Sequence, residues 1–281
     1  MLTPSWLDGL ELGDAVSCEA LDGGVANQTY RVRTSLGHSV VVKTHEHAPL
    51  DLYAHEADGL NALRVPGGFV VPEVLRVTEE FLVLADLGSN RAPADWREAG
   101  HRLAVQHQQT ADKFGYHHDN YLGMVPQRNP WTVDGHAFFA EHRLLRFLEV
   151  PLCYNALTAT DRRNLERVAN RLSEFIPEQS PALLHGDLWH GNLMADLEGA
   201  PAVIDPAVYY GWPEAELSML IGCGNIPDEF FTAYVELHPL EPGWRDRMPL
   251  LHLREHLAVT AHFADAQNAV NEIRTTLAHY S

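Results

Sequence analysis

The chain has 281 residues, 46% of them hydrophobic, which is enough to fill the core of one large or two coupled domains. Acidic residues outnumber basic ones by 38 to 20, for a formal net charge of −18. This charge disfavours non-specific binding to nucleic acid or to an anionic membrane, so we expect neither as a partner. It would also repel an anionic substrate unless a bound cation or local basic groups offset it.

No apolar run approaches the 18 residues of a membrane span, and the first 20 residues lack the basic and apolar regions of a signal peptide. We therefore expect a cytoplasmic protein. The three cysteines form no C-x-x-C pair, so they predict neither a disulfide framework nor a zinc site. The 17 histidines are numerous, but no His/Cys spacing, including that of the adjacent pair His117-His118, matches a known metal site. Scattered surface histidines are therefore favoured over a metal site as the explanation of this pair.

The N-terminal third has the pattern of an antiparallel meander that is followed by one helix and two strands. The predicted strands span residues 16–22, 28–34, 39–44, 70–72 and 81–84, and the predicted helix spans residues 51–63. A Gly-rich turn, which includes Gly23, Gly24 and Asn27, joins the first two strands. It lacks the full G-x-G-x-x-G pattern of protein kinases, so alone it indicates only a hairpin turn.

Lys43 favours a nucleotide-binding role for this turn over that of a plain hairpin turn, because Lys43 ends a V-V-V-K strand. A lysine at that position contacts the α- and β-phosphates of ATP in kinases and pairs with a glutamate on the next helix. Glu56 is the candidate, and a solvated helix glutamate is the alternative. The strand at 81–84 leads into Ala85-Asp86-Leu87-Gly88, which we interpret as a hinge between two lobes.

The predicted hinge offers backbone amide and carbonyl groups from Leu84 to Leu87, including Ala85, to the edge of an adenine ring. The Asp86 side chain either reaches a ribose or caps the turn, and the sequence leaves both open.

Beyond residue 96 the patterns are mostly helical. Helices are predicted at residues 96–112, 138–149, 159–176, 213–220, 227–237, 246–263 and 265–279. Within the first, His107 is interpreted as a structural core histidine. Residues 113–131 form a predicted loop rich in aromatic residues, Gly and Pro, which either binds an acceptor substrate or is anchored by aromatic packing. Together the patterns predict an α+β fold with a sheet-rich lobe, residues 1–86, and a larger helical lobe, residues 87–281.

The strongest chemical signal is the segment His185-Gly186-Asp187-Leu188-Trp189-His190-Gly191-Asn192. Asp187 and Asn192 have the spacing of the kinase catalytic loop, in which the aspartate accepts a hydroxyl proton and the asparagine ligates Mg²⁺. Apolar runs at 193–194 and 202–204 flank a turn and predict a β-hairpin, with Asp205 directly after it as a second metal ligand. Gly186 and Gly191 are expected to relieve the backbone where the loop turns.

The run HGDLWHGN followed by IDPAVYYG resembles the fructosamine (ketosamine) kinase family, of the aminoglycoside-phosphotransferase branch of the protein-kinase-like fold. The loop at 113–131 carries further similar runs, and the resemblance covers roughly residues 15–280. It implies a bilobal kinase that uses ATP and Mg²⁺. It also implies that a fructosamine or ribulosamine, on an amine or a protein lysine, is phosphorylated at its 3-hydroxyl, after which the product decomposes and the amine is deglycated.

The resemblance implies a role for each candidate residue. Asp187 is the base, and Asn192 and Asp205 ligate Mg²⁺. The nucleotide is held by Gly23, Gly24, Asn27, Lys43, Glu56, Leu84, Ala85, Asp86 and Leu87. The acceptor is contacted by Trp189, His190, Asn120 and Tyr209, although a packing role for Trp189 is also open.

Two other functions are weighed. One is a kinase of the same fold for another alcohol, such as an aminoglycoside, choline or homoserine; the Trp189 position and the DPAVYYG run argue against it. The other is a nucleotide-binding scaffold without turnover, which is disfavoured because Lys43, Asp187, Asn192 and Asp205 are all present. A monomer and a homodimer are both compatible with the sequence.

Overall fold

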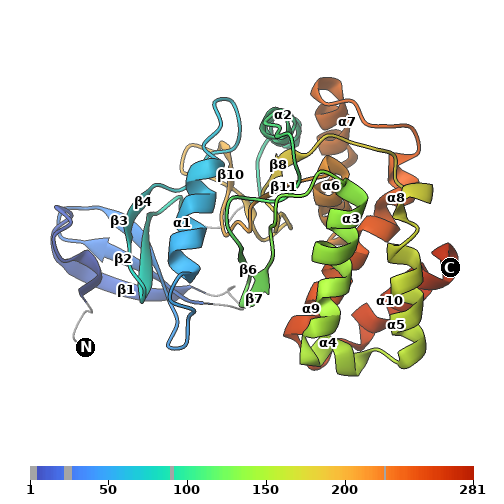
Figure 1. Cartoon of the computed structure of the whole chain (residues 1–281). Helices are drawn as coiled ribbons and strands as arrows, with labels where there is room; N and C mark the ends of the chain where they lie inside the picture. Colours follow the sequence, from blue (N-terminus) through green and yellow to red (C-terminus); the bar gives the residue numbers. More distant parts are fainter. Residues whose placement is uncertain (1–4, 22–26, 89–91, 225) are drawn as a thin grey trace.

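The computed structural model describes residues 5–21, 27–88, 92–224 and 226–281. A sheet and helix α1 form one end of the molecule, helices form the other, and several short hairpins lie between them (Figure 1). This arrangement confirms the predicted α+β, protein-kinase-like fold with a sheet-rich and a helix-rich part. No described helix is both long and apolar enough to cross a membrane.

Five strands of the described chain form an antiparallel sheet in the order β1-β2-β3-β5-β4. They are β1 (Ala15–Leu21), β2 (Gln28–Thr34), β3 (Ser39–Thr44), β4 (Val74–Val77) and β5 (Phe81–Ala85). Alternation along β3 sends Val40 and Val42 into a small core with Val83, on one face of the sheet. Val41 and Lys43 therefore lie on the opposite face, where both line a cavity.

Helix α1 (Leu52–Ala62) packs against the sheet through Tyr53 and Leu60, which are fully buried. Residues 70–72, predicted as a strand, are not one. Val70 instead makes a single parallel bridge to Ala202: its amide donates to the Pro201 carbonyl (3.0 Å), and its carbonyl accepts from the Val203 amide (2.9 Å). Pro72 has no amide hydrogen, so a longer ladder would lack a donor there.

The rest of the chain is mostly helical and surrounds the larger hydrophobic core. The helices are α2 (Trp96–His107), α3 (Gly135–Phe139), α4 (Pro151–Ala156), α5 (Ala159–Ala169), α6 (Pro213–Gly222), α7 (Asp228–Leu237), α8 (Trp244–Leu251), α9 (Leu253–His262) and α10 (Gln267–Tyr280). Local signals set their starts: the Asp95 carboxylate caps α2 by accepting from the Glu98 amide at 2.9 Å.

Several predicted helices are shorter or divided. The one expected at 138–149 continues α3 as a π-helical turn (Ala140–Leu144) and a 3-10 turn (Leu145–Glu149). The one expected at 246–263 is divided at His252 into α8 and α9. Apolar spacing reports which face is buried, and it does not distinguish a continuous helix from two consecutive ones.

The predicted loop at 113–131 contains a hairpin, β6 (Asn120–Leu122) and β7 (Val125–Gln127), so the loop interpretation was wrong for those six residues. Gly123 makes the turn with a positive φ of 58°. The flanking chain is also pinned, because Phe114 and Thr132 exchange two backbone hydrogen bonds of 2.9 Å. The segment therefore presents a fixed edge towards α1.

Candidate active site

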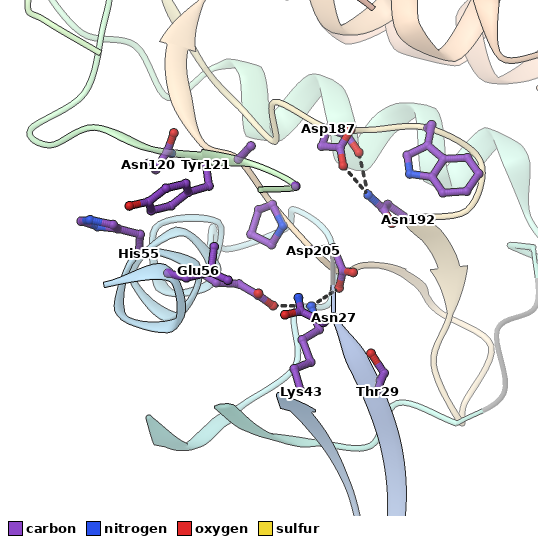
Figure 2. Close-up of a pocket in the computed structure, with 15 residues that line it drawn as sticks. Asn27, Thr29, Lys43, His55, Glu56, Asn120, Tyr121, Asp187, Asn192 and Asp205 are labelled. Carbon is purple, nitrogen blue, oxygen red and sulfur yellow. Dashed lines mark hydrogen bonds and ion pairs between the residues drawn. The ribbon is translucent and has the colours of Figure 1, made fainter. Parts of the chain in front are cut away.

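Four short strands position the catalytic segment: β8 (Ala182–Leu184), β9 (Leu193–Ala195), β10 (Pro201–Val203) and β11 (Tyr209–Gly211). The predicted hairpin is confirmed as β9 paired with β10. Asn192 directly precedes β9, and Asp205 lies two residues after β10. Together with Asp187, their side chains line one cavity with Lys43 and Glu56 (Figure 2).

Lys43 links the sheet to the hairpin. Its Nζ contacts the carboxylates of both Glu56, on α1, and Asp205, and the lysine is only 4% exposed. The predicted Lys43–Glu56 pair is therefore present. Burial alone would disfavour the ammonium, but the two carboxylates outweigh it and raise the pKa of Lys43. The lysine is held charged and directed into the cleft.

Asp187 and Asn192 are oriented by each other. The Asn192 Nδ2 donates to the Asp187 backbone carbonyl (2.8 Å) and to its Oδ2 (3.2 Å), which turns the Asn192 amide oxygen away from Asp187. Burial raises the pKa of Asp187, and the nearby negative charge of Glu255 adds to the shift. A carboxylate with a raised pKa accepts a proton more readily, as a general base requires.

The donor set fits a hard cation. Asn192 supplies a neutral amide oxygen and Asp205 a carboxylate, both lining the same cavity, and Mg²⁺ binds such oxygen ligands. Asp205 has a φ of 59°, and among the described residues it is the one non-glycine with positive φ. A residue held in this costly region is over-determined by its surroundings, a condition that is common at functional sites.

Two cavities meet at this point. The loop-side cavity, of about 140 Å³, is lined by His55, Glu56, Tyr121, Gly123, Asp187 and Trp189, among others. The hinge-side cavity, of about 250 Å³, is lined by Arg31, Val41, Leu84, Ala85, Met194 and Ile204, among others. Thr29, Lys43, Asn192 and Asp205 line both. These four residues, which we call the shared centre, therefore form the boundary between the two cavities.

The predicted hinge residues, Leu84 to Leu87, line the hinge-side cavity. The Asp86 carboxylate accepts from Arg31 Nε (2.7 Å), Ser39 Oγ (2.6 Å) and the Gly88 amide (2.9 Å). Burial works against its ionisation, but these donors hold the pKa of Asp86 below its usual range. Of the two roles left open, capping the turn is the one that these contacts support.

The structure separates the four predicted acceptor residues. Trp189 lines the loop-side cavity and is half-buried. Asn120 also lines it, but its Nδ2 donates to the Val208 carbonyl (2.8 Å) and its Oδ1 accepts from Gln127 and Asn129, so its amide holds the loop together.

The other two predicted acceptor residues lie elsewhere. His190 is exposed, with its ring 4.9 Å from that of Trp189, and it lies outside the linings of both cavities. The structure does not place Tyr209 where it could contact the acceptor. The residue is 2% exposed and packs in the core, with the Arg143 guanidinium 3.8 Å over its ring. Tyr209 is the first residue of β11, a strand whose two end residues are buried, and it lies outside the linings of both cavities.

Gly23 and Gly24 lie outside the described residues, whereas Asn27 lines the loop-side cavity and accepts a hydrogen bond from the Tyr53 hydroxyl at 3.1 Å. Gly186 has the expected turn geometry, with φ of 81°, and a Cβ there would lie 2.0 Å from the Ala207 carbonyl oxygen. At Gly191 a Cβ would lie 2.4 Å from the Trp189 ring, so any larger residue there would displace the indole.

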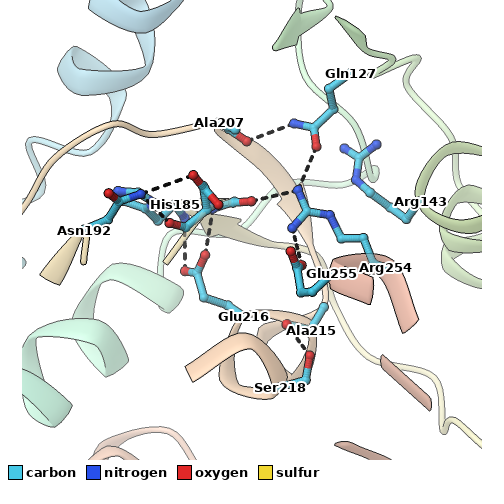
Figure 3. Close-up of polar contacts among 12 residues, drawn as sticks. Gln127, Arg143, His185, Asn192, Ala207, Ala215, Glu216, Ser218, Arg254 and Glu255 are labelled. Carbon is cyan, nitrogen blue, oxygen red and sulfur yellow. Dashed lines mark hydrogen bonds and ion pairs between the residues drawn. The ribbon is translucent and has the colours of Figure 1, made fainter. Parts of the chain in front are cut away.

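Sequence reasoning missed the buried residues that clamp this loop (Figure 3). Glu216 accepts from the backbone amides of His185 (3.0 Å) and Gly186 (2.7 Å), and Arg254 donates to the Gly186 carbonyl at 2.8 Å. The peptide before Asp187 is therefore held from both sides. Arg254 also pairs with Glu255, and a charged residue in a predicted helix carries no signal that it is buried.

His107 completes the support behind Glu216. Its two ring nitrogens lie 2.8 Å from the Tyr234 hydroxyl and 3.0 Å from the Glu216 carboxylate, and all three side chains are buried. The interpretation of His107 as a structural core histidine is confirmed.

Comparisons with known proteins agree with this geometry. The family model for fructosamine kinase matches residues 11–279. An Enterococcus faecium protein named "probable ketoamine kinase" is 35% identical over 242 residues, which is 84% of this chain and 86% of the relative. A chloroplastic protein-ribulosamine 3-kinase of Oryza sativa subsp. indica is 32% identical over 249 residues, covering 85% of this chain and 71% of the relative.

A solved structure gives the same result in three dimensions. The crystal structure of a Thermobifida fusca protein assigned as a fructosamine-3-kinase matches with a TM-score of 0.84 and 33% identity, over 95% of each chain. The chain therefore belongs to the fructosamine kinase family, whose members are ATP-dependent phosphotransferases.

Proposed function

We propose that this chain transfers the γ-phosphoryl group of Mg·ATP to the 3-hydroxyl of ketosamines, that is, of fructosamines or ribulosamines on small amines or protein lysines. The observation that carries the proposal is the position of the shared centre: Lys43, Asn192 and Asp205 line both cavities. A group transferred between ligands in the two cavities has to pass this centre.

The nucleotide is assigned to the hinge-side cavity. Val41, Leu84 and Ile204 offer apolar surface for a planar base, and the hinge backbone at Ala85 to Leu87 offers it hydrogen bonds. Lys43, positioned by Glu56, contacts the α- and β-phosphates, while Asn192 and Asp205 would hold Mg²⁺. When bound, Mg²⁺ supplies charge that neutralises the phosphates. We also propose that the lobes divide between residues 86 and 87, just after β5.

The acceptor is assigned to the loop-side cavity. Asp187 accepts the proton of the attacking hydroxyl, and the raised pKa of its carboxyl favours this role. Trp189 and Tyr121 line the same space, and aromatic faces pack well against sugar rings. In the product the phosphate lies on the carbon beside the keto group, so loss of a proton from the carbon that bears the amine gives an enaminol from which inorganic phosphate is eliminated. Water would then hydrolyse the resulting imine, which releases the free amine and a 3-deoxy dicarbonyl sugar. That decomposition makes the reaction a deglycation step.

Turnover with purified protein and Mg·ATP tests the proposal. We expect phosphorylation of fructosyl-lysine or ribulosyl-lysine with at least about a hundredfold higher kcat/KM than of an aminoglycoside, choline or homoserine. Phosphorus NMR of the product identifies the phosphorylated hydroxyl. Higher kcat/KM on one of the other alcohols would assign the chain to another acceptor, and phosphate on a different hydroxyl would remove the 3-position from the proposal.

A further inference from the structure

A second group of ligand-type side chains lies outside the active site, against α1. Asp58 comes from α1, and His117 and His118 come from the segment that leads into β6. One ligand atom from each of the three lies within 4.8 Å of the other two. No pattern in the sequence connects them, because Asp58 is 59 positions before His117 and the two histidines are predicted to lie on the surface.

The distances from Asp58 to the two histidines are close to those between ligands of a bound transition metal. Asp58 Oδ2 lies 3.1 Å from His118 Nε2 and 3.5 Å from His117 Nε2. Around a tetrahedral Zn²⁺ with bonds of about 2.0–2.2 Å, neighbouring ligand atoms are about 3.3–3.5 Å apart. The two separations from Asp58 need only small adjustments, and the ligand atoms of the two histidines lie within 4.8 Å of each other. All three groups are therefore within reach of one cation, and imidazole with carboxylate suits Zn²⁺ better than Mg²⁺.

The hydrogen bonds around the group are compatible with a bound cation. His118 Nδ1 lies 2.8 Å from the Asp119 backbone carbonyl, which can only accept, so Nδ1 carries a proton. A neutral His118 ring then directs the lone pair of Nε2 at the Asp58 carboxylate, and two acceptors at 3.1 Å repel each other. A metal ion between them removes the repulsion, as a second proton on the ring would.

The outer contacts are those of an oriented metal ligand set. The Nδ1–H bond to a backbone carbonyl fixes the tautomer of His118, and the Tyr116 hydroxyl donates to Asp58 Oδ2 at 2.8 Å. Such partners commonly hold metal-binding histidines and carboxylates in place. Solvent can reach the group, because the side chains of His117 and Asp58 are 54% and 38% exposed.

We propose that Asp58, His117 and His118 bind a late first-row divalent cation such as Zn²⁺, with water in the remaining coordination position. The site is separate from the proposed Mg²⁺ ligands and does not depend on the proposed function. It would fasten α1, which carries Glu56, to the segment before β6. The His118 ring also lies 4.1 Å from that of His55, which lines the loop-side cavity, so the metal would stiffen that wall.

Calorimetric titration of the EDTA-treated, dialysed full chain with ZnCl₂, in saturating Mg²⁺, tests the proposal. We expect one equivalent of Zn²⁺ to bind, roughly 10–100-fold more weakly in His118→Ala and in His117→Ala. His101→Ala is the matched control, because His101 Nε2 also lies beside a carboxylate, 2.9 Å from Glu236, but the described part of the chain places no third metal-ligand side chain next to this pair. It should bind Zn²⁺ like the parent.

Two further measurements keep the outcome unambiguous. Asp205→Ala should retain the zinc equivalent, which separates this site from the proposed Mg²⁺ site. Circular dichroism in EDTA should show that each variant is folded. Of the two histidine variants, His117→Ala is the one less expected to disturb folding, because His117 is exposed. The absorption spectrum of the Co²⁺-loaded protein should change in His117→Ala and not in His101→Ala. No zinc binding, equal weakening by His101→Ala, or loss of the equivalent in Asp205→Ala would each overturn the proposal.

Discussion

The two cavities share a charged boundary but are otherwise built differently. The hinge-side cavity has apolar side chains on two faces, Val41 and Leu84 on one and Met194 and Ile204 on the other, with hinge backbone at the edge. The loop-side cavity is lined by carboxylates and aromatic rings that come from α1, the β6–β7 hairpin and the catalytic loop. One is suited to a flat base and the other to a hydroxyl-rich acceptor.

The difference shows which part of the site follows from general kinase chemistry and which does not. Backbone groups and apolar side chains can hold the nucleotide in any kinase of this fold, so that cavity carries little information about the acceptor. The residues that could select an acceptor lie on the other side of Asp187. Substitutions that affect one cavity and not the other test this division.

The largest effect is expected for Asp187→Asn, which keeps the shape of the side chain and removes the base. We expect kcat to fall by about 10²–10⁴-fold, the usual contribution of a positioned general base, with ATP affinity largely unchanged. Steady-state kinetics and a nucleotide-binding titration measure the two. Near-parental kcat would show that Asp187 is not the base.

Arg254→Met removes half of the clamp on the Gly186 peptide and leaves Glu255 buried without its partner. We expect the free energy of unfolding to fall by about 3–5 kcal/mol, as for other broken buried pairs. Folded protein should show a lower kcat with an unchanged KM for ATP. Arg254→Lys keeps the charge but not the planar fork, so it should be intermediate. Parental unfolding curves for Arg254→Met would contradict the clamp.

Asp205→Ala removes a carboxylate from the boundary of both cavities. We expect Mg²⁺-dependent nucleotide affinity to fall by at least about 10–100-fold, because a proposed metal ligand is lost. The comparison is between ATP titrations with Mg²⁺ and with EDTA in parent and variant. Equal affinity for Mg·ATP in the two proteins would take Asp205 out of the metal site.

Two smaller effects, each confined to the KM of one substrate, would distinguish the roles of the two cavities directly. Met194→Ala should raise the KM for ATP about tenfold, and Trp189→Ala should raise the KM for the ketosamine about tenfold, each leaving the other KM unchanged. Trp189→Phe keeps an aromatic face and serves as the control. If Trp189→Ala left both KM values at parental levels, its indole would have the packing role.

The smallest effect is expected in the pH dependence of stability. Burial opposes ionisation of Glu216, but its bonds to His107 and to the backbone of His185 and Gly186 hold its pKa below the ordinary value. Its contribution to the free energy of unfolding is therefore complete above the unfolded-state pKa of about 4.3, and is lost as the pH falls through the folded pKa.

Urea unfolding from about pH 7 to about pH 3 measures this contribution. Glu216→Gln should be less stable at neutral pH and less sensitive to acid over that range. An acid dependence identical to that of the parent would show that Glu216 does not contribute.

Local signals predicted much of this site. The β-branched alternation gave β2 and β3 with their observed bounds and put Lys43 on the cleft face. The apolar runs at 193–194 and 202–204 predicted the β9–β10 hairpin that lies between Asn192 and Asp205. Each of these rests on residues that are neighbours in sequence, where periodicity and turn chemistry act.

What the sequence did not predict depends on contacts between distant segments. Arg254 reaches Gly186 across 68 positions, and Asp58 meets His118 across 60. Tyr209 was predicted at the acceptor, but it is buried against Arg143 from a distant segment. Such contacts are set by how the elements pack, and no pattern within one segment contains that information.

The left-handed backbone at Asp205 restricts which amino acids position 205 accepts, before any reaction is considered. Glycine adopts that conformation without a Cβ penalty, and asparagine and aspartate tolerate it better than other residues, whereas a β-branched side chain would be strained. In a saturation library at this codon, sorted only for folded protein, we expect Gly, Asn and Asp to be enriched. A second sort of those survivors for turnover would then measure what the negative charge alone contributes.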